Sequence, residues 1–395
     1  MIPDGGRRVL VLSNLYPSAA FPGAGPFVRD QVRELARQNT LAVVAPLRIA
    51  PLNVHTARRV LAVPRFTTED GIPVTRPRFP GIPVGGYTIE PRLWASRLGP
   101  VLRRIYDELP GELVHAHFAL PDGFAAARFA AADRVPLVVT LWGSDVLQLG
   151  RSERLRRFLT RTFAEARAIV AVSSELAERA EALGAQAQRL RVIPGGVPYR
   201  PALRREEARG GLGLDSTAVC VLWVGGLVPV KQPLDAIRAF AELRSRAGGE
   251  EELRLVVIGD GPLRDEAREL VRRLGLEATV RLAGRVSRDT VWTWQCAADV
   301  LINSSRSEGT PLAVLEALGA GTPVVAYPLP GVRAVVEAVK GGRVAAEPTP
   351  DALAAAVRDE LALGRDRGRL AATARAQFDI ERTCRALEEV YDSVL

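Results

Sequence analysis

Residues 300–327, VLINSSRSEGTPLAVLEALGAGTPVVAY, contain a strand-like run, a helix-like run and a second strand-like run. The runs at 300–303 and 323–327 are short, apolar and rich in β-branched residues, as buried strands usually are. The segment between them, LAVLEALGAG, is typical of a helix that ends at a glycine. This order predicts two parallel strands joined by a crossover helix.

The same alternation extends along the whole chain. Residues 7–15 and 112–118 are strand-like, residues 25–38 are helix-like, and the pattern restarts at residues 218–226. Two such series predict an α/β fold with two parallel sheets and helices on both faces of each. The break between them is expected at residues 192–210, where Pro and Gly cluster before a charged run. Open parallel sheets bind ligands beyond the carboxyl ends of their strands, so we expect function in those loops.

Length and composition indicate a globular protein of two domains. The chain has 395 residues, of which 47% are apolar and 25% are charged. No apolar stretch reaches the roughly 18 residues that a membrane-spanning helix needs, and the start of the chain predicts a buried strand and not a secretory signal. The three cysteines are widely spaced and suggest neither a disulfide framework nor a zinc site, so we expect a cytoplasmic setting.

The positive charge lies in the first half of the chain. The net charge is +8, and residues 1–200 hold 27 Arg and no Lys against 17 acidic residues, which leaves residues 201–395 slightly acidic. Such a field attracts phosphates or anionic lipid headgroups, and it also fits an ordinary solvated surface. Nucleic acid is not expected, because no helix-turn-helix, RNP-like or zinc-finger pattern accompanies the charge.

Two carboxylates in the opening stretch indicate a ligand site. Glu308 precedes the predicted helix, whereas Glu316 lies inside it, about 8 Å along the axis. Pro311 suits the first helical position, and Thr310 is expected to cap the helix. The free amides and dipole of a helix N-terminus favour a phosphate. An acid before the helix, an anion site at its start and an acid within it fit the groups of a sugar nucleotide. The alternative is that Glu308 is an ordinary loop charge and Glu316 a solvated helix residue.

The ordered motifs resemble those of a known family. Glu308 and Glu316, followed by GTPVVAY at 321–327, resemble the signature of the retaining family-4 glycosyltransferases, which have the GT-B fold. The resemblance extends over nearly the whole chain. The other segments that carry it are VLSNLYPSAAFPGAGPFVRDQVRELA, HAHFALPDG, TLWGSD, VIPGGV, VGGLVPVKQPLDAIRAFAEL, VIGDGPLRDEARELVRRLGL and VRLAGRVSRD.

The resemblance implies two facing Rossmann-like domains with parallel sheets. Residues 1–195 would form an acceptor-binding domain, and residues 196–378 would form a nucleotide-sugar-binding domain. Residues 379–395 would form a C-terminal helix that crosses back to the first domain. An apolar stripe at helical spacing over residues 380–391 fits that role.

In the second domain, the resemblance implies a donor site. Lys231 would neutralise the donor diphosphate and help the nucleoside diphosphate to leave. Glu308 would contact the transferred sugar, and Glu316 would contact the ribose. The segment that would contact sugar and phosphate consists of Gly309, Thr310, Pro311 and Leu312.

One donor-site position departs from the family pattern. Family members usually carry an Arg where this chain has Gly226, so the leaving-group site loses one cation. Arg285, Arg306 or an arginine of the first domain would then substitute, or the enzyme would be slower or use a different donor. Arg285 and Val286 correspond to the loop whose backbone contacts the nucleobase, although Arg285 equally fits a surface ion pair.

In the first domain, the resemblance implies an acceptor side. Gly23 and Gly25 would let the backbone approach the diphosphate and acceptor closely, and an ordinary turn is the alternative. Asp145 fits a loop that faces the cleft. Many relatives carry His where this chain has Trp142, and we expect the change to alter acceptor shape or sugar selectivity.

The histidines divide into one site candidate and two others. His117 resembles a family histidine beside the reacting sugar. His115 is expected on the opposite face of the strand, in a structural role, and His55 has no ligand-like setting. With only three histidines in the chain, no metal site is expected.

The expected chemistry uses neither a metal nor a cofactor. No D-x-D occurs in the chain, so the metal-binding arrangement of the other major glycosyltransferase fold is absent. Lys231, helix amides and neighbouring arginines would stabilise the leaving group. The resemblance implies retention at the anomeric carbon, with the departing phosphate oxygen as the base.

The implied activity is that of a hexosyltransferase-type glycosyltransferase. It would use a nucleotide-sugar donor and a saccharide or lipid-linked acceptor, in cell-surface polysaccharide or glycolipid assembly. The amphipathic segment 151–169 fits either a core helix or a peripheral contact with anionic membrane at the inner face. A sugar-nucleotide epimerase of GT-B type and a catalytically silent sugar-nucleotide-binding protein are the alternatives. Donor turnover without acceptor would support the first, and donor binding without transfer the second.

Overall fold

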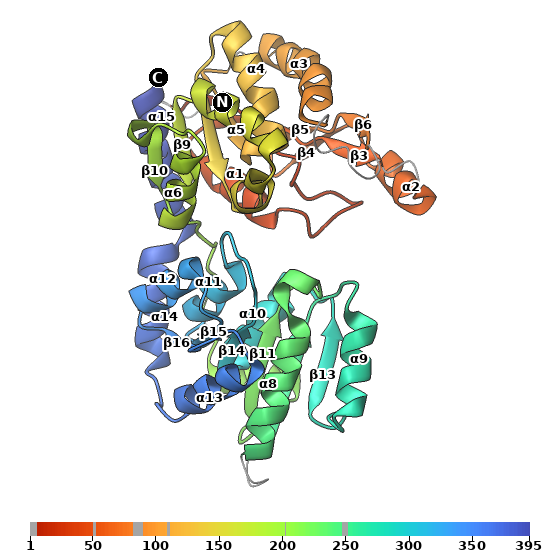
Figure 1. The fold of residues 1–395 in the computed structure, drawn as a ribbon, viewed down its shortest axis with the longest axis vertical. Coiled ribbons are helices and arrows are strands. Elements are labelled where there is room, and N and C mark those ends of the chain that lie inside the picture. The colour runs from red at the N-terminus through yellow and green to blue at the C-terminus, as the bar shows by residue number, and fades with distance from the viewer. Residues whose placement is uncertain (1–5, 50–52, 82–89, 109–110, 202, 247–251) are drawn as a thin grey trace. The chain divides into compact units, whose positions relative to one another are not determined.

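The described part of the chain forms two compact units (Figure 1). Unit 1 contains the described residues up to Gly196 together with Ile380–Leu395, and unit 2 is Val197–Asp379. The chain therefore leaves unit 1 once and returns to it once. The computed structural model describes residues 6–49, 53–81, 90–108, 111–201, 203–246 and 252–395.

Unit 1 is built on an eight-stranded sheet. Its pairs are parallel except for an edge hairpin, in which β4 runs antiparallel to β5. This hairpin was not predicted. A separate two-stranded sheet pairs β3 (Leu47–Ile49) with β6 (Arg78–Pro80). The strands of the main sheet, in spatial order, are β10 (Leu190–Val192), β9 (Ala168–Ala171), β8 (Leu137–Leu141), β7 (Leu113–His117), β1 (Arg8–Leu12), β2 (Thr40–Val44), β5 (Ile72–Thr75) and β4 (Phe66–Glu69).

Helices cover both faces of this sheet, because its interior strands are apolar on both sides. One core cluster joins the sheet to α3, α4 and α5, and another joins it to α1 and α15. The helices are α1 (Pro26–Leu35), α2 (Val54–Ala62), α3 (Glu90–Glu108), α4 (Phe124–Asp133), α5 (Glu153–Glu165), α6 (Ser174–Ala182) and α15 (Ile380–Val394). Short helical turns are η2 (Ala119–Gly123), η3 (Ser144–Gln148), η4 (Leu149–Arg151) and η5 (Ala187–Arg189).

Helix α5 resolves the two alternatives for the amphipathic segment. Its apolar side chains Leu155, Phe158, Leu159 and Phe163 are buried in the unit 1 core. Phe158 makes an edge contact with Phe124 of α4, with ring centroids 4.9 Å apart. The segment is therefore a core helix, and its apolar face is not free to enter a membrane.

Helix α15 belongs to unit 1. The residues of its expected stripe are buried there, and the Thr383 hydroxyl donates to the Pro194 carbonyl oxygen at 2.9 Å. The preceding helix, α14, belongs to unit 2. The stripe consists of Ile380, Cys384, Leu387, Val390 and Tyr391.

Unit 2 is built on a six-stranded, wholly parallel sheet. Its spatial order is β13 (Val280–Gly284), β12 (Leu253–Ile258), β11 (Val219–Val224), β14 (Val300–Asn303), β15 (Val324–Ala326) and β16 (Gly342–Val344). Its helices are α7 (Arg205–Leu212), α8 (Pro233–Arg246), α9 (Arg264–Arg273), α10 (Arg288–Ala297), α11 (Leu312–Gly319), α12 (Pro330–Ala338), α13 (Pro350–Leu361) and α14 (Arg367–Phe378), with a short turn, η6 (Pro229–Lys231).

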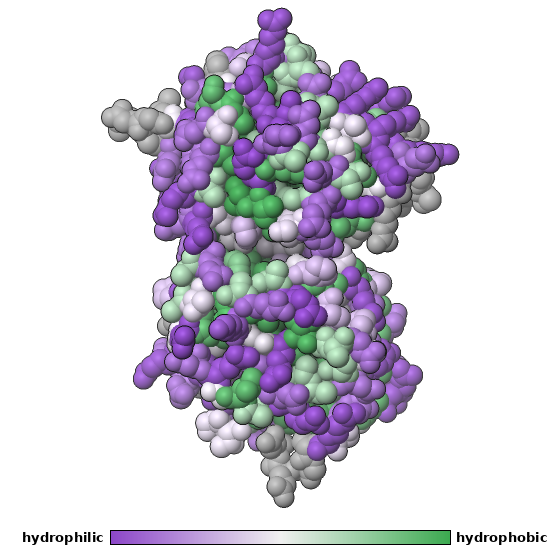
Figure 2. All heavy atoms as spheres, turned by 60° about the vertical axis from the view of Figure 1, so that its left-hand side comes forward, coloured by the Kyte–Doolittle hydropathy of each residue, from purple (hydrophilic) through white to green (hydrophobic). Residues whose placement is uncertain are grey.

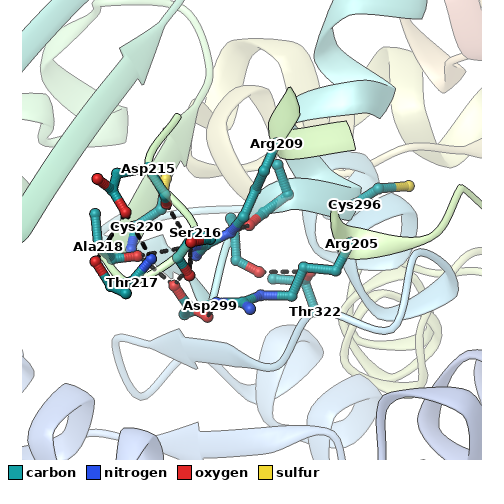
Figure 3. A network of polar contacts seen from close by, with 12 residues as sticks. Arg205, Arg209, Asp215, Ser216, Thr217, Ala218, Cys220, Cys296, Asp299 and Thr322 are labelled. Carbon is teal, nitrogen blue, oxygen red and sulfur yellow. Dashed lines mark hydrogen bonds and ion pairs between the residues drawn. The ribbon is translucent and has the colours of Figure 1, made fainter. Parts of the chain in front are cut away.

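A buried arginine joins α7 to the amino ends of β11 and β14 (Figure 3). The Arg209 guanidinium donates to the Asp299 carboxylate at 2.6 Å and to the carbonyl oxygens of Ala218 and Ala297. Two more carbonyl oxygens, those of Asp215 and Ser216, accept from it. This guanidinium therefore satisfies carbonyl groups that the strands leave unpaired.

The strand order reverses once in each sheet. In unit 2, β11 lies between β12 and β14. The strands β12 and β13 lie on one side of β11, and β14, β15 and β16 lie on the other side. In unit 1, β1 lies between β2 and β7 in the same way. The crevice beyond the carboxyl ends of the strands at such a switch point is where open α/β sheets bind ligands. The loops after β11 and β14, and those after β1 and β7, are therefore the places to look for a site.

Candidate active site

Lys231 and Glu308 form an ion pair at the switch point of unit 2. Lys231 ends η6, after β11, and Glu308 lies in the loop after β14. The Lys231 Nζ and Glu308 Oε2 atoms are 2.6 Å apart, and the Glu308 side chain is only 7% exposed. Its other oxygen, Oε1, accepts from Ser305 Oγ at 2.6 Å and from Asn303 Nδ2 at 3.3 Å. Three donors thus hold a buried carboxylate in one orientation.

Hydrogen bonds hold the two loops against each other. The Ser304 hydroxyl accepts from the Trp223 indole N–H of β11 at 3.0 Å. The same hydroxyl lies 2.8 Å from the Gln232 carbonyl oxygen, to which it can donate. The Arg306 amide donates to the Val230 carbonyl oxygen at 2.8 Å. The position of Lys231 relative to Glu308 is therefore set by the backbone.

Glu316 lies one turn inside α11 and contacts α10. Its Oε2 atom accepts from Gln295 Nε2 at 3.2 Å, and its Oε1 atom lies 3.7 Å from an Arg288 guanidinium nitrogen. Gln295 is fully buried, whereas the Glu316 side chain is about a quarter exposed. Side chains of α10 thus hold the Glu316 carboxylate on one side, and part of the Glu316 side chain remains exposed to solvent.

The start of α11 differs from the expectation. The helix begins at Leu312, so Pro311 is the residue before it, and no side chain caps it. Thr310 does not cap the helix, because its Oγ1 atom is buried without a partner in the described structure. Within the described residues, the amides of Gly309, Thr310 and Ala313 also have no acceptor. This helix end is consequently open to an anion.

Open space lies beside Gly226, the position where the resemblance led us to expect an arginine. A Cβ atom built there would be 4.0 Å from the nearest atoms, those of Asp260 and Val228. Of the expected substitutes, Arg306 lies 3.7 Å from an Asp235 oxygen. Arg285 is exposed and makes no ion pair within the described residues.

Arg285 and Val286 follow β13 in a glycine-containing turn. Gly284 has a φ of +69°, and the amide of Gly259 donates to its carbonyl oxygen at 2.9 Å. Val286 is partly buried against the unit 2 core. The backbone of this loop is therefore fixed beside the loop after β12.

In unit 1, Gly25 is required by a close backbone approach. Its φ is +59°, and a Cβ atom there would lie 2.0 Å from the Leu15 carbonyl oxygen. Gly25 is the N-cap of α1, so it also fixes where this helix starts. Gly23 is exposed, two residues earlier in the same loop.

His115 and His117 lie on the same face of β7. The expectation that they face opposite ways was wrong, because side chains two apart in a strand point the same way. Their ring centroids are 4.4 Å apart. His115 Nδ1 is 2.7 Å from the Tyr391 hydroxyl, and its Nε2 atom is 2.8 Å from Thr140 Oγ1. The Trp142 indole N–H donates to His117 Nδ1 at 3.1 Å.

Burial keeps both histidines uncharged. It lowers the pKa of His115 to about 3. It also lowers the pKa of His117 well below its usual value, with a smaller contribution from the neighbouring His115. Neutral imidazoles act through one N–H donor and one nitrogen acceptor each.

Asp145 fixes the loop after β8 from inside. It is almost fully buried, and it accepts from the amides of Ala119 at 2.8 Å and Gly143 at 3.0 Å. Burial raises its pKa, while these amide hydrogen bonds oppose the rise. Because both oxygens are occupied by backbone amides, Asp145 shapes the loops around the site.

A pocket of about 200 Å³ lies at the carboxyl edge of the unit 1 sheet. Seven of its nine lining residues are apolar, and several come from the segments that follow β1, β7 and β8. The lining residues are Asn14, Leu15, Pro91, Phe118, Leu120, Pro121, Ser144, Leu149 and Leu155.

Among the described residues, no helix is both long enough and apolar enough to cross a membrane. The face shown in Figure 2 is mostly hydrophilic, with smaller apolar patches. The described residues also contain no cluster of three or more side chains that could hold a metal ion. Cys220, Cys296 and Cys384 are buried free thiols.

Comparison with known proteins shows that this chain resembles glycosyltransferases in both of its halves. The model "Glycosyltransferase Family 4" matches residues 22–200, and the model "Glycosyl transferases group 1" matches residues 204–377. TuaC of Bacillus subtilis (strain 168), whose name associates it with glycosyl transfer in teichuronic acid biosynthesis, is 30% identical over 98% of each chain. The chain belongs to glycosyltransferase family 4. The predictions of family and enzyme class are therefore confirmed.

Other relatives of this family-4 glycosyltransferase support the assignment. A D-inositol 3-phosphate glycosyltransferase of Nocardia farcinica is 32% identical, with 87% of this chain and 83% of the relative covered. Sucrose-phosphate synthase from Thermosynechococcus elongatus has a TM-score of 0.77 at 18% identity, over 98% of each chain. Anabaena HepE in complex with UDP and glucose has a TM-score of 0.72 at 20% identity, over 98% of this chain and 100% of that chain. These structures confirm the GT-B fold.

Sequence patterns missed the residues that orient the two candidate site carboxylates, Glu308 and Glu316. Asn303 and Ser305 hold Glu308 from the same loop, and a polar pair at the end of a strand was the available signal. Gln295 holds Glu316 from a helix about twenty residues earlier, and nothing in its local sequence marks it.

Proposed function

We propose that this glycosyltransferase moves a sugar from a nucleotide-sugar donor bound by unit 2 to an acceptor bound by unit 1, with retention of anomeric configuration. The observation that carries the proposal is the Lys231–Glu308 ion pair at the switch point, with Glu316 one turn inside the adjacent helix. A cation, an open helix N-terminus and two oriented carboxylates match the charge and hydroxyl pattern of a sugar nucleotide.

The roles of the side chains follow from their chemistry. Lys231 neutralises charge on the diphosphate, and the amides at the start of α11 bind its oxygens. Glu308 accepts hydrogen bonds from hydroxyls of the transferred sugar, and Glu316 accepts from the ribose. The loop of Arg285 and Val286 contacts the nucleobase through its backbone.

Retention fits the way Glu308 is held. Its carboxylate already accepts from three protein donors, which favours a binding role over that of a nucleophile. The departing phosphate oxygen then takes the proton of the attacking hydroxyl on the same face of the sugar. Lys231 stabilises the charge that grows on that leaving group.

The unit 1 pocket supports a lipid-linked acceptor over a free saccharide. Only Asn14 and Ser144 offer polar side chains among its lining residues, whereas a sugar ring needs many hydrogen-bond partners. With the excess of arginine in this unit, the pocket suits an amphiphilic acceptor at the inner face of the membrane. TuaC is named for teichuronic acid biosynthesis, which supports the proposal that this enzyme acts in polysaccharide assembly.

A thermal-shift screen of nucleoside diphosphates and their sugars tests the donor assignment. We expect the nucleoside diphosphate of one base to raise the Tm of the protein, because ligands that bind only the native state stabilise it. The sugar nucleotide that carries the same base and the correct sugar should raise the Tm by a similar amount. The matching radiolabelled donor should then label a lipid extract. Failure of every nucleotide to raise Tm would contradict the proposal. Donor turnover without acceptor would favour the epimerase instead.

The variant Glu316→Ala should weaken nucleotide binding. Removing a charged acceptor from ribose hydroxyls should raise the nucleoside diphosphate Kd roughly 10- to 100-fold, because hydrogen bonds to charged groups are the stronger ones. The kcat at saturating donor should change little. Calorimetric titration measures the Kd, and Glu337→Ala, an exposed helix glutamate of the same unit, is the control. An unchanged Kd would remove Glu316 from the ribose site.

The variant Gly226→Arg should speed up the enzyme. The open space beside Gly226 can hold the extra cation that the family pattern places there. We expect roughly a tenfold rise in kcat/KM for the donor, because a second positive charge stabilises the leaving diphosphate. Gly226→Ala controls for the backbone change. If both variants behave as the wild type, another cation already fills this role.

A further inference from the structure

Trp142 and His117 form a hydrogen bond whose direction is fixed by the chemistry of the two side chains. The indole N–H of Trp142 lies 3.1 Å from His117 Nδ1, and the two rings are nearly parallel, with an interplanar angle of 25°. An indole has a donor and no acceptor, so His117 Nδ1 must be the acceptor. In a neutral imidazole the single proton is then on Nε2.

His115 provides an internal contrast. Both of its nitrogens face hydroxyl groups, those of Tyr391 and Thr140, and a hydroxyl can either donate or accept. Its surroundings therefore permit either tautomer. Of these two histidines, only His117 has its proton position dictated by a neighbour.

Because Trp142 occupies the Nδ1 atom of His117, the Nε2 atom is the one that can bond to a ligand. His117 is fully buried, and its Nε2 atom has no hydrogen-bond partner within the described structure. A buried N–H donor without a partner costs free energy, which a hydrogen bond to an oxygen atom of a bound ligand would recover. Phe118, the next residue, lines the pocket at the carboxyl edge of the sheet.

We propose that Trp142 is a positioning residue that fixes His117 as the Nε2–H tautomer and so presents a permanent hydrogen-bond donor to an oxygen of the bound sugar. The inference rests on the proposed function for its ligand, but the tautomer itself belongs to the free protein. A histidine at position 142 could donate or accept and would not dictate the proton position in this way.

The tautomer can be measured directly by nitrogen-15 NMR of the histidine-labelled protein. The chain has only three histidines, so His117 can be assigned by the loss of one signal set in His117→Gln. In the wild type we expect a protonated Nε2 and an unprotonated Nδ1 on His117. In Trp142→Phe we expect signal from both tautomers. A protonated Nδ1 in the wild type, or an unchanged His117 spectrum in Trp142→Phe, would overturn the inference.

Kinetics separate positioning from packing. Phe at position 142 can keep the ring contact with Phe27, whose centroid lies 4.3 Å from that of Trp142, and removes only the N–H and part of the ring. We expect kcat to fall roughly 5- to 10-fold, the effect of weakening one hydrogen bond, with donor KM nearly unchanged.

A double variant supplies the decisive comparison. In His117→Gln, the side-chain amide can replace the Nε2–H donor without a tautomer, so adding Trp142→Phe should change kcat less than about twofold. An equal loss in both backgrounds would show that Trp142 acts through packing alone. If the wild-type enzyme transferred no sugar, the proposed function would fail while the NMR result still decided the tautomer.

Discussion

Replacing Lys231 by Ala should lower kcat roughly 10²- to 10³-fold, with a less than tenfold rise in the nucleoside diphosphate Kd. The negative charge on the leaving diphosphate grows as the glycosidic bond breaks, so a cation placed there stabilises the transition state more than the bound donor. The Lys231 side chain is positioned for this by its contact with Glu308 and by the backbone bonds between the two loops. Single-turnover rates at saturating donor, with calorimetric Kd values, measure both quantities.

The chain offers a matched control for this variant. It contains only two lysines, Lys231 and Lys340, and Lys340 is an exposed residue that follows α12. Lys340→Ala removes the same charge from the same unit and should keep wild-type kinetics. A Lys231→Ala enzyme with normal kcat and a strongly raised Kd would show that Lys231 binds the donor without helping it to react.

The parallel sheets could be predicted from sequence because their strands are buried on both faces. Continuous apolar runs such as Val219–Val224 stand out between helical segments. The antiparallel edge was missed, although its turn carries a strong signal. Asp70 and Gly71, with φ angles of 52° and 79°, make a two-residue turn between β4 and β5. The flanking strands are only half buried and gave no clear apolar pattern.

The site residues differ in how local their signals are. The placement of Glu308 before the helix and of Glu316 inside it was predictable, because both lie within one strand, loop and helix. The contact between Trp142 and His117 was not, because it depends on β7 and β8 being neighbours in register, with His117 beside Thr140. Thr310 was misassigned because Ser and Thr favour N-caps in general, whereas here the backbone bends one residue later, at Pro311.

Arg209 shows where sequence reasoning about charge fails most clearly. It lies in a run of charged residues, LRREEARG, which resembles a solvated linker. In the structure its side chain is only 2% exposed and makes the contacts shown in Figure 3. Arg209 becomes buried because its side chain reaches the amino ends of β11 and β14, which no local pattern reveals.

Replacing Arg209 by Met should destabilise unit 2 by about 3–5 kcal/mol, the usual result of removing one partner of a buried pair. The Asp299 carboxylate would lose its most buried partner, and four carbonyl oxygens would lose a donor, at Asp215, Ser216, Ala218 and Ala297. Methionine fills similar space, so the loss reflects polar groups without partners and not a cavity. Urea unfolding measures the free energy, and amide exchange of β11 assigns the loss to unit 2.

Arg205→Met is the matched control for Arg209→Met. Arg205 comes from the same helix and contacts the same carboxylate, but its side chain is 30% exposed and Asp299 is its only ion-pair partner within the described residues. Because Arg205 is more exposed than Arg209, we expect its removal to cost less, nearer the roughly 0–1 kcal/mol of exposed ion pairs. Equal losses in the two variants would mean that the charge on Asp299, and not the satisfaction of the strand-end carbonyl groups, determines stability. A much larger loss for Arg209→Met would show that this arginine acts mainly as a hydrogen-bond donor to the backbone, and it would explain why a charged residue is kept inside the unit.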